Sequence, residues 1–194
     1  MSKLNRKGFT LIELLAVITI MGILMVVAIP SVSRTIENTR RDSFLDTAKQ
    51  YVNGVKTMFI SDSIECPESA AGAAAGTYVL GTSLKNGTYY IRIDTTQTST
   101  TGSGTEYPII LESGGKSSWS SKDVKGYVRV VVSGSGTGTL KQTYYVALSD
   151  NLHGIKEPAT PIEYLKLKRG NVAVSGVAYT DVAIPASALV CKEV

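Results

Sequence analysis

The sequence predicts an α+β protein in which a long N-terminal helix packs against an antiparallel β-sheet. Three observations support this prediction. Residues 9–29 are almost entirely apolar, apolar residues recur at helical spacing between Phe44 and Ile60, and strand-like segments follow from Thr77 onward. The 194 residues, of which 19% are charged, suit one globular domain with an added anchor.

The apolar segment from Phe9 to Ile29 is interrupted only by Thr10, Glu13, Thr19 and Gly22. As a helix it would span roughly 30 Å, the thickness of the bilayer hydrocarbon. An acid inside such a span costs roughly 2.5–3.5 kcal/mol on insertion scales. A plain membrane anchor gives no reason for Glu13, although its place near one end would let it reach toward the headgroups.

Basic residues precede the apolar segment at Lys3, Arg6 and Lys7, which favours a cytoplasmic N-terminus. An ordinary secretory signal fits poorly, because the apolar run is too long and no small-residue cleavage pattern closes it. The formal net charge is +4, and these three residues account for most of it. The remainder has no concentrated basic stripe of the kind that nucleic-acid binding needs.

The stretch "KGFTLIELLAVITIMGILMVVAIP" resembles the class III signal of type IV pilins and their relatives. That signal has a short basic leader, a glycine, a phenylalanine, a glutamate four residues later and an apolar helix. Gly8, Phe9 and Glu13 occupy these positions here. The continuation "RTIENTRRDSFLDTAKQY" most resembles major pilins of Gram-positive, clostridial-type bacteria.

The resemblance implies that a prepilin peptidase cuts between Gly8 and Phe9 and N-methylates the new amine of Phe9. In a filament, Glu13 would pair with the Phe9 amine of a neighbouring subunit, and it would lack a partner in the single subunit. Opposite charges attract strongly in a low dielectric, and an unpaired one is costly there. The implied partners are identical subunits, the peptidase, and a membrane assembly platform with cytoplasmic ATPases.

The type IV pilin fold, as implied by the resemblance, divides the chain into four segments. These are a leader (1–8), a transmembrane and polymerisation helix (9–30), the rest of the long helix packing on the head (31–65), and a globular β-rich head (66–194). Cys66-Pro67 is expected to end the helix. The chain would lie in the cell membrane before assembly and in an extracellular pilus afterwards.

Two residues weaken the apolar helix, Gly22 and Pro30. Proline removes one backbone hydrogen bond and predicts a kink. The resemblance suggests that the segment between them unwinds in the filament, so a simple kink and unwinding both stay open.

The expected strands are rich in Val, Ile, Thr and Tyr and are separated by Gly, Ser and Asn. They are Thr88–Ile93, Tyr107–Leu111, Gly126–Val132, Leu140–Leu148, Pro161–Lys168 and Asn171–Tyr179. The last two are expected to form a hairpin turning near Gly170. Asn86-Gly87 predicts another hairpin turn, although with Thr88 it also matches a glycosylation sequon. The small-residue segment Glu68–Gly76 is expected to be a loop.

The two cysteines, Cys66 and Cys191, predict one disulfide in a chain that leaves the cytoplasm. Two buried free thiols are the alternative. A bond between them would resemble the disulfide that bounds the variable C-terminal region of many pilins.

No catalytic or metal site is predicted, so we expect neither an enzyme nor a cofactor. "GGKSS" lacks the glycine of a phosphate loop, since Ile110 occupies that position. His153 is the only histidine, which excludes a metal cluster built on several histidines, and we expect it to be solvated or hydrogen-bonded. Trp119 is expected to pack locally in a loop, and the Thr/Ser run Thr95–Thr101 is a possible site of O-glycosylation.

The resemblance implies a structural subunit of a type IV pilus that serves adhesion, aggregation, biofilm formation or twitching motility. The alternatives are a pseudopilin of a type II secretion or DNA-uptake system, or a minor pilin at the tip. A nucleic-acid partner is expected only for a DNA-uptake pilus. A calcium-binding pseudopilin would show clustered carboxylates near its C-terminus, whereas Asp181 and Glu193 are isolated in the sequence.

Overall fold

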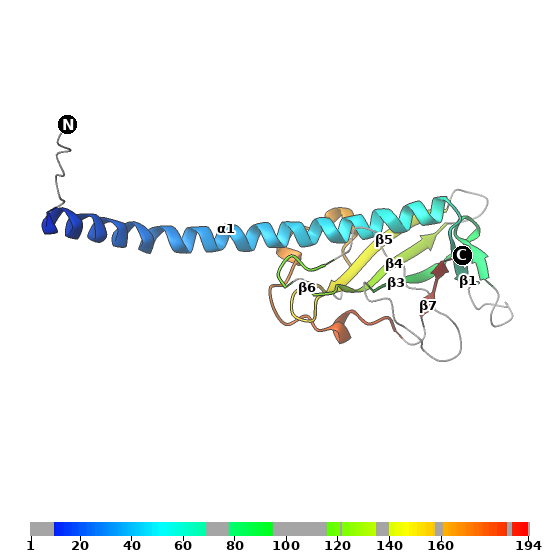
Figure 1. Cartoon of the computed structure of the whole chain (residues 1–194). Coiled ribbons are helices and arrows are strands. Elements are labelled where there is room, and N and C mark those ends of the chain that lie inside the picture. The colour runs from blue at the N-terminus through cyan, green and yellow to red at the C-terminus, as the bar shows by residue number, and fades with distance from the viewer. Residues whose placement is uncertain are drawn as a thin grey trace, which may run out of the picture. The chain divides into compact units, whose positions relative to one another are not determined.

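The computed structural model describes residues 10–68, 78–94, 116–120, 122–134, 140–157, 161–185 and 188–193 (Figure 1). The chain divides into two compact units, Met1–Thr39 and Arg40–Val194. The second unit holds every strand of the described residues and all of the buried core.

The long N-terminal helix is confirmed as α1, Leu11–Ile60, and it is helical through Gly22 and Pro30. Every side chain of α1 up to Arg40 is exposed. The helical apolar stripe is confirmed in the second unit. Its buried members are Phe44, Leu45, Ala48, Tyr51, Val52, Val55 and Phe59.

The prediction that Cys66-Pro67 ends the helix is wrong, because α1 ends at Ile60. Asp62 takes a left-handed backbone conformation (φ 51°), and Ser63 N donates to Met58 O at 3.0 Å, which is the closing bond of a Schellman motif. The Asp62 carboxylate is held by Thr82, whose hydroxyl donates to Oδ1 at 2.7 Å. The chain therefore turns before Cys66, and Ile64–Pro67 forms strand β1.

The main sheet has five strands in the order β6-β5-β4-β3-β7. Their bounds are β6 Gly154–Ile155, β5 Lys141–Ser149, β4 Lys125–Ser133, β3 Gly87–Asp94 and β7 Leu189–Val190. All neighbours are antiparallel except β7, which runs parallel to β3. The structure thus confirms the predicted strands at 88–93, 126–132 and 140–148.

A second, three-stranded antiparallel sheet has the order β2-β1-β8, where β2 is Tyr78–Leu80 and β8 is Lys192–Glu193. In the second unit, Figure 1 shows α1 lying along β3, β4 and β5. Alternate strand residues such as Ile91, Val130 and Val146 share one core with the helix stripe. The fold is therefore α+β, with a long helix packed against a largely antiparallel sheet.

The predicted strands 161–168 and 171–179 and their hairpin are wrong. This part of the chain forms short 3₁₀ helices, namely η2 (Tyr164–Lys166), η3 (Arg169–Asn171) and η4 (Tyr179–Val182). Tyr164 and Leu167 are buried three residues apart, which suits a 3₁₀ turn and not a strand. The Asn171 side chain accepts a hydrogen bond from Lys168 N at 2.8 Å, so the expected hairpin turn is closed locally.

The predicted hairpin turn at Asn86-Gly87 is also wrong. Asn86 lies in a bend before β3, and β2 pairs with β1 instead of β3. The Asn86 side-chain amide donates to Gly134 O at 2.8 Å and so fastens this bend to the end of β4. The predicted strand Tyr107–Leu111, the run Thr95–Thr101 and most of the segment Glu68–Gly76 lie outside the described residues.

Candidate assembly segment and the anchors of the head

Glu13 lies in the first turn of α1 and is bound by Thr10. Thr10 donates to Glu13 Oε2 from its backbone N at 2.8 Å and from its hydroxyl at 2.7 Å. In return, Glu13 N donates to Thr10 Oγ1 at 3.3 Å. These reciprocal bonds form a capping box, which satisfies orphan N–H groups at the helix start. Glu13 thus has hydrogen-bond partners in the single chain, but both come from uncharged Thr10, so the expected charge pairing with a neighbour's amine stays a prediction.

The sequence carries a signal for this contact. Thr10-Leu11-Ile12-Glu13 has the pattern Ser/Thr-x-x-Glu directly before an apolar run, which marks a helix start. Both Thr10 bonds go to one carboxylate oxygen, Oε2. Among the described residues, Oε1 accepts no hydrogen bond, so one face of the carboxylate stays available to another donor.

The apolar side chains that follow Glu13 are uncovered. Between Leu14 and Ile36, the exposed fractions of the large apolar side chains range from 74% at Val26 to 47% at Ile36. Among the described residues, α1 is the one helix whose length and composition would allow it to cross a membrane, and none of its most apolar 18-residue window is buried. An uncovered surface of this size needs lipid or another protein surface.

The other predicted assembly residues divide into two groups. Gly8 and Phe9, where cleavage and methylation are predicted, lie outside the described residues. Gly22 and Pro30 lie inside α1 and are helical in the single chain. A Cβ added at Gly22 would meet no atom within 4 Å, so packing in the single chain does not require a glycine there.

The disulfide prediction is confirmed, and its place in the fold explains what it holds. Cys66 lies in β1, and Cys191 lies between β7 and β8, with a Cα–Cα distance of 4.1 Å. Cys191 N also donates to Tyr90 O of β3 at 2.8 Å. The C-terminal residues therefore run from the five-stranded sheet to the three-stranded sheet, and the disulfide joins them to β1 at that crossing.

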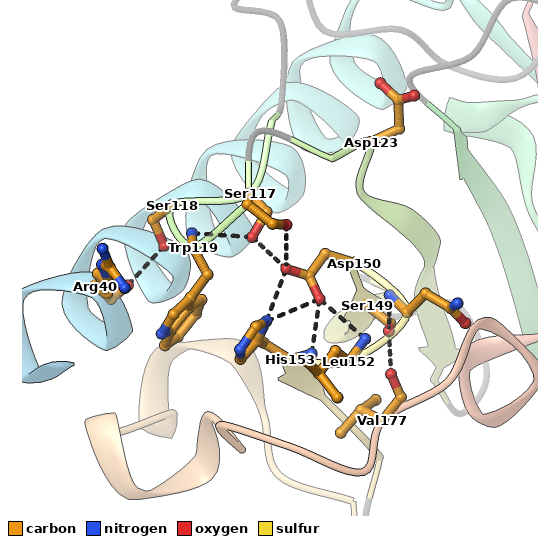
Figure 2. Close-up of polar contacts among 12 residues, drawn as sticks. Arg40, Ser117, Ser118, Trp119, Asp123, Ser149, Asp150, Leu152, His153 and Val177 are labelled. Atoms are coloured by element: carbon orange, nitrogen blue, oxygen red, sulfur yellow. Dashed lines mark hydrogen bonds and ion pairs between the residues drawn. The ribbon is translucent and has the colours of Figure 1, made fainter.

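A buried carboxylate organises the turn between β5 and β6 (Figure 2). Asp150 is fully buried and accepts bonds from the Ser117 hydroxyl at 2.5 Å and the Ser120 hydroxyl at 3.1 Å. The backbone N–H groups of Leu152 and His153 donate to its other oxygen at 3.0 and 2.7 Å. Burial alone would raise the pKa of Asp150, but these hydrogen bonds outweigh it and lower that pKa to about 2.

His153 and Trp119 complete this cluster, as Figure 2 shows. The His153 Nδ1 atom lies 2.9 Å from Asp150 Oδ2. The Trp119 ring stacks on the imidazole with centroids 4.6 Å apart and planes inclined by 4°. The prediction of a hydrogen-bonded histidine is confirmed. Trp119 lies in a loop as predicted, but the prediction that it packs locally is wrong, because its ring contacts His153 and Phe44 from distant parts of the chain. The sequence did not predict the cluster, because its two loops lie about thirty residues apart.

Ser117, Asp150 and His153 are also the residue types of a hydrolase triad, but their arrangement differs from one. In a triad the base hydrogen-bonds the nucleophilic hydroxyl. Here the Ser117 hydroxyl donates to Asp150, and no hydroxyl of the described residues is hydrogen-bonded to the His153 ring. The arrangement holds two loops together and does not activate a nucleophile.

Comparison with known families finds one match. Residues 3–29 match the family model described as the prokaryotic N-terminal methylation motif. No curated protein and no solved structure matches the chain. The motif covers Gly8, Phe9 and the Thr10–Glu13 pair, and it supports a type IV pilin-like prepilin, which belongs to a structural class of proteins and not to an enzyme family.

Proposed function

We propose that this chain is the structural subunit of a type IV pilus and polymerises through its N-terminal helix. The observation that carries the proposal is Glu13, which lies inside the methylation motif at the start of a helix with an uncovered apolar surface. Its carboxylate is oriented by Thr10 and keeps one oxygen without a donor among the described residues.

Cleavage before Phe9 is compatible with the hydrogen bonds in the first turn of α1. Prepilin peptidase cleaves between Gly8 and Phe9 and methylates the Phe9 amine, which stays positively charged. The capping box uses only Thr10 and Glu13, so it survives cleavage. The new amine then lies one residue before Thr10 in every mature subunit.

Assembly pairs this amine with the Glu13 carboxylate of a neighbouring subunit. Thr10 holds Oε2, and the amine of the neighbour approaches the carboxylate from the side of Oε1. A charge left unpaired in the apolar interior is strongly disfavoured, so the pair fixes the register between successive helices. In the filament, the segment between Gly22 and Pro30 unwinds and lets the subunit lengthen.

Residues 9–30 span the cell membrane before assembly, and the head is displayed on an extracellular pilus afterwards. The filament serves attachment, aggregation, biofilm formation or twitching motility, with force supplied by the cytoplasmic ATPases of the assembly platform. The sequence of the segment 34–51 favours a major pilin of a Gram-positive, clostridial-type bacterium.

Mass spectrometry of sheared surface filaments tests this proposal. A major pilin predicts that the dominant species begins at N-methylated Phe9. A trace amount in the filaments would identify a minor, tip-located pilin instead. Processed protein that stays entirely in the membrane would contradict the proposal and favour a pseudopilin of a secretion or DNA-uptake system.

A further inference from the structure

Two loops of the head hold the first turn of α1 in the second unit. The Ser118 hydroxyl donates to Arg40 O at 2.9 Å, and the Trp119 ring lies 5.7 Å from the Phe44 ring. On another loop, the Arg169 Nε donates to Asp42 Oδ1 at 2.7 Å. These contacts lie where the side chains of α1 first become buried, since Phe44 is the first buried residue of the helix.

The first of these loops, Lys116–Ser120, has little regular structure of its own. Lys116 forms an isolated bridge with Asp123, and Ser117 N donates to Lys122 O at 2.9 Å. Its inner side is fastened by Asp150, which accepts the hydroxyl bonds of Ser117 and Ser120. Trp119 adds its stack on His153. The loop thus bridges the β5–β6 turn on one side and α1 on the other.

We propose that Lys116–Ser120 is a latch that holds the turn Arg40–Phe44 of α1 on the head, and that Asp150 keeps this latch closed. No residue of the latch lies in the assembly segment, so the proposal is independent of how the subunit polymerises. Only its consequence rests on the proposed function: tension carried by α1 in a filament enters the head at this turn.

The buried charge of Asp150 is the physical reason that the latch stays closed. Opening the loop would remove the Ser117 and Ser120 hydroxyls and leave a carboxylate with only the donors of its own turn. A buried charge that loses its donors is strongly disfavoured. The Ser117 and Ser120 hydroxyls therefore stay bound or leave together. The latch closes cooperatively and not contact by contact.

Hydrogen exchange on the full chain in detergent micelles tests the latch. The peptides that cover residues 40–48 report the turn, and quenching of Trp119, the only tryptophan, reports the loop. Asp150→Asn removes the buried charge. Ser118→Ala removes the hydrogen bond that the loop donates to Arg40 O. The matched control is Asp181→Asn, since Asp181 binds Lys156 and Ala178 N and has no contact with the latch.

The latch predicts that Asp150→Asn speeds exchange of residues 40–48 by roughly tenfold, the effect of losing one buried hydrogen bond. Ser118→Ala speeds the same exchange by less, because its bond to Arg40 O is exposed. Asp150→Asn also makes Trp119 easier to quench, and Asp181→Asn changes neither signal. The proposal is overturned if Trp119 becomes accessible in Asp150→Asn while residues 40–48 exchange as in the unaltered chain. If Asp150→Asn does not fold, an unchanged exchange rate in Ser118→Ala overturns it. Because single subunits are measured, loss of filaments has no bearing on the outcome.

Discussion

Thr10 and Glu13 exchange hydrogen bonds across the first turn of α1, with Thr10 N 2.8 Å from Glu13 Oε2 and Glu13 N 3.3 Å from Thr10 Oγ1. The same carboxylate that we propose for assembly therefore also caps the start of the helix in the single chain. In that proposal, its orientation is set before a neighbouring subunit binds.

Thr10→Val tests whether this orientation matters. The change keeps the shape of the side chain but removes the hydroxyl that donates to Glu13 Oε2. We expect the first turn to fray and the yield of sheared filaments to fall, while processing at Gly8 continues. Thr10→Ser restores a hydroxyl and is the control. Full filament yield from Thr10→Val would show that the capping box has no part in assembly.

The buried carboxylate of Asp150 predicts a pH dependence of head stability. Its pKa is about 2 in the folded chain, against 3.8 for an ordinary aspartate. The unfolded chain therefore binds a proton more readily, so the stabilisation is complete above about pH 4 and is lost as pH falls through 2. The loss is on the order of 2 kcal/mol. Thermal unfolding measured between pH 6 and 2 follows it.

Asp150→Asn is the control for this dependence, because other carboxylates act in the same direction. A hydrogen bond from Arg169 lowers the pKa of Asp42, and one from Lys156 lowers that of Asp181. Both side chains are partly exposed, so solvent screens much of their effect. We expect the unfolding temperature of the variant to fall less steeply as the pH is lowered from 6 to 2. The same steepness in the variant and the unaltered chain would mean that Asp150 does not titrate as described.

The disulfide predicts a large loss of stability on its removal. It joins residues 125 positions apart and ties the crossing of the two sheets to β1. Replacing Cys66 and Cys191 together with serine should cost roughly 2–5 kcal/mol in the free energy of unfolding. Denaturant unfolding measures this cost, and intact mass without reductant checks that the bond is present in the unaltered chain. A loss well under 1 kcal/mol would contradict the role assigned to the bond.

Gly126, at the start of β4, occupies a position where the backbone leaves no room for a side chain. Its φ is +155°, and an added Cβ would lie 2.0 Å from Ala147 O in β5. Gly126→Ala should force the two strands apart and destabilise the head by about 3 kcal/mol or more. Gly170→Ala is the matched control, because a Cβ there meets nothing within 4 Å. Equal unfolding midpoints for the two variants would refute the constraint.

The parts of the fold that the sequence predicted are those with a long, regular pattern. The stripe from Phe44 to Phe59 and the strands β3, β4 and β5 bury residues at the periods of a helix and a strand. The segment 161–182 has an alternating apolar pattern too, but its Val177 and Val182 cover Tyr127 and Ala147 on the sheet. Val177 lies in an irregular stretch before η4, and Val182 ends η4. An extended covering segment and a strand give the same pattern, so the sequence could not separate them.

The candidate site was predictable where its residues are close in sequence. Glu13 stood out as an acid in an apolar run, and the four-residue pattern with Thr10 was also present. Asp150 gave no such signal, since its donors Ser117 and Ser120 come from a distant loop. Contacts of that kind depend on how the sheet and the loops are placed, which no local pattern records.

The most direct test of the central claim is the filament yield of Glu13→Val in the source cells. Pairing of Glu13 with the neighbour's Phe9 amine predicts that the variant is inserted in the membrane and cleaved after Gly8 but forms few or no filaments. Immunoblotting of membranes and of the sheared surface fraction measures both steps together. Normal filament yield from Glu13→Val would contradict the claim.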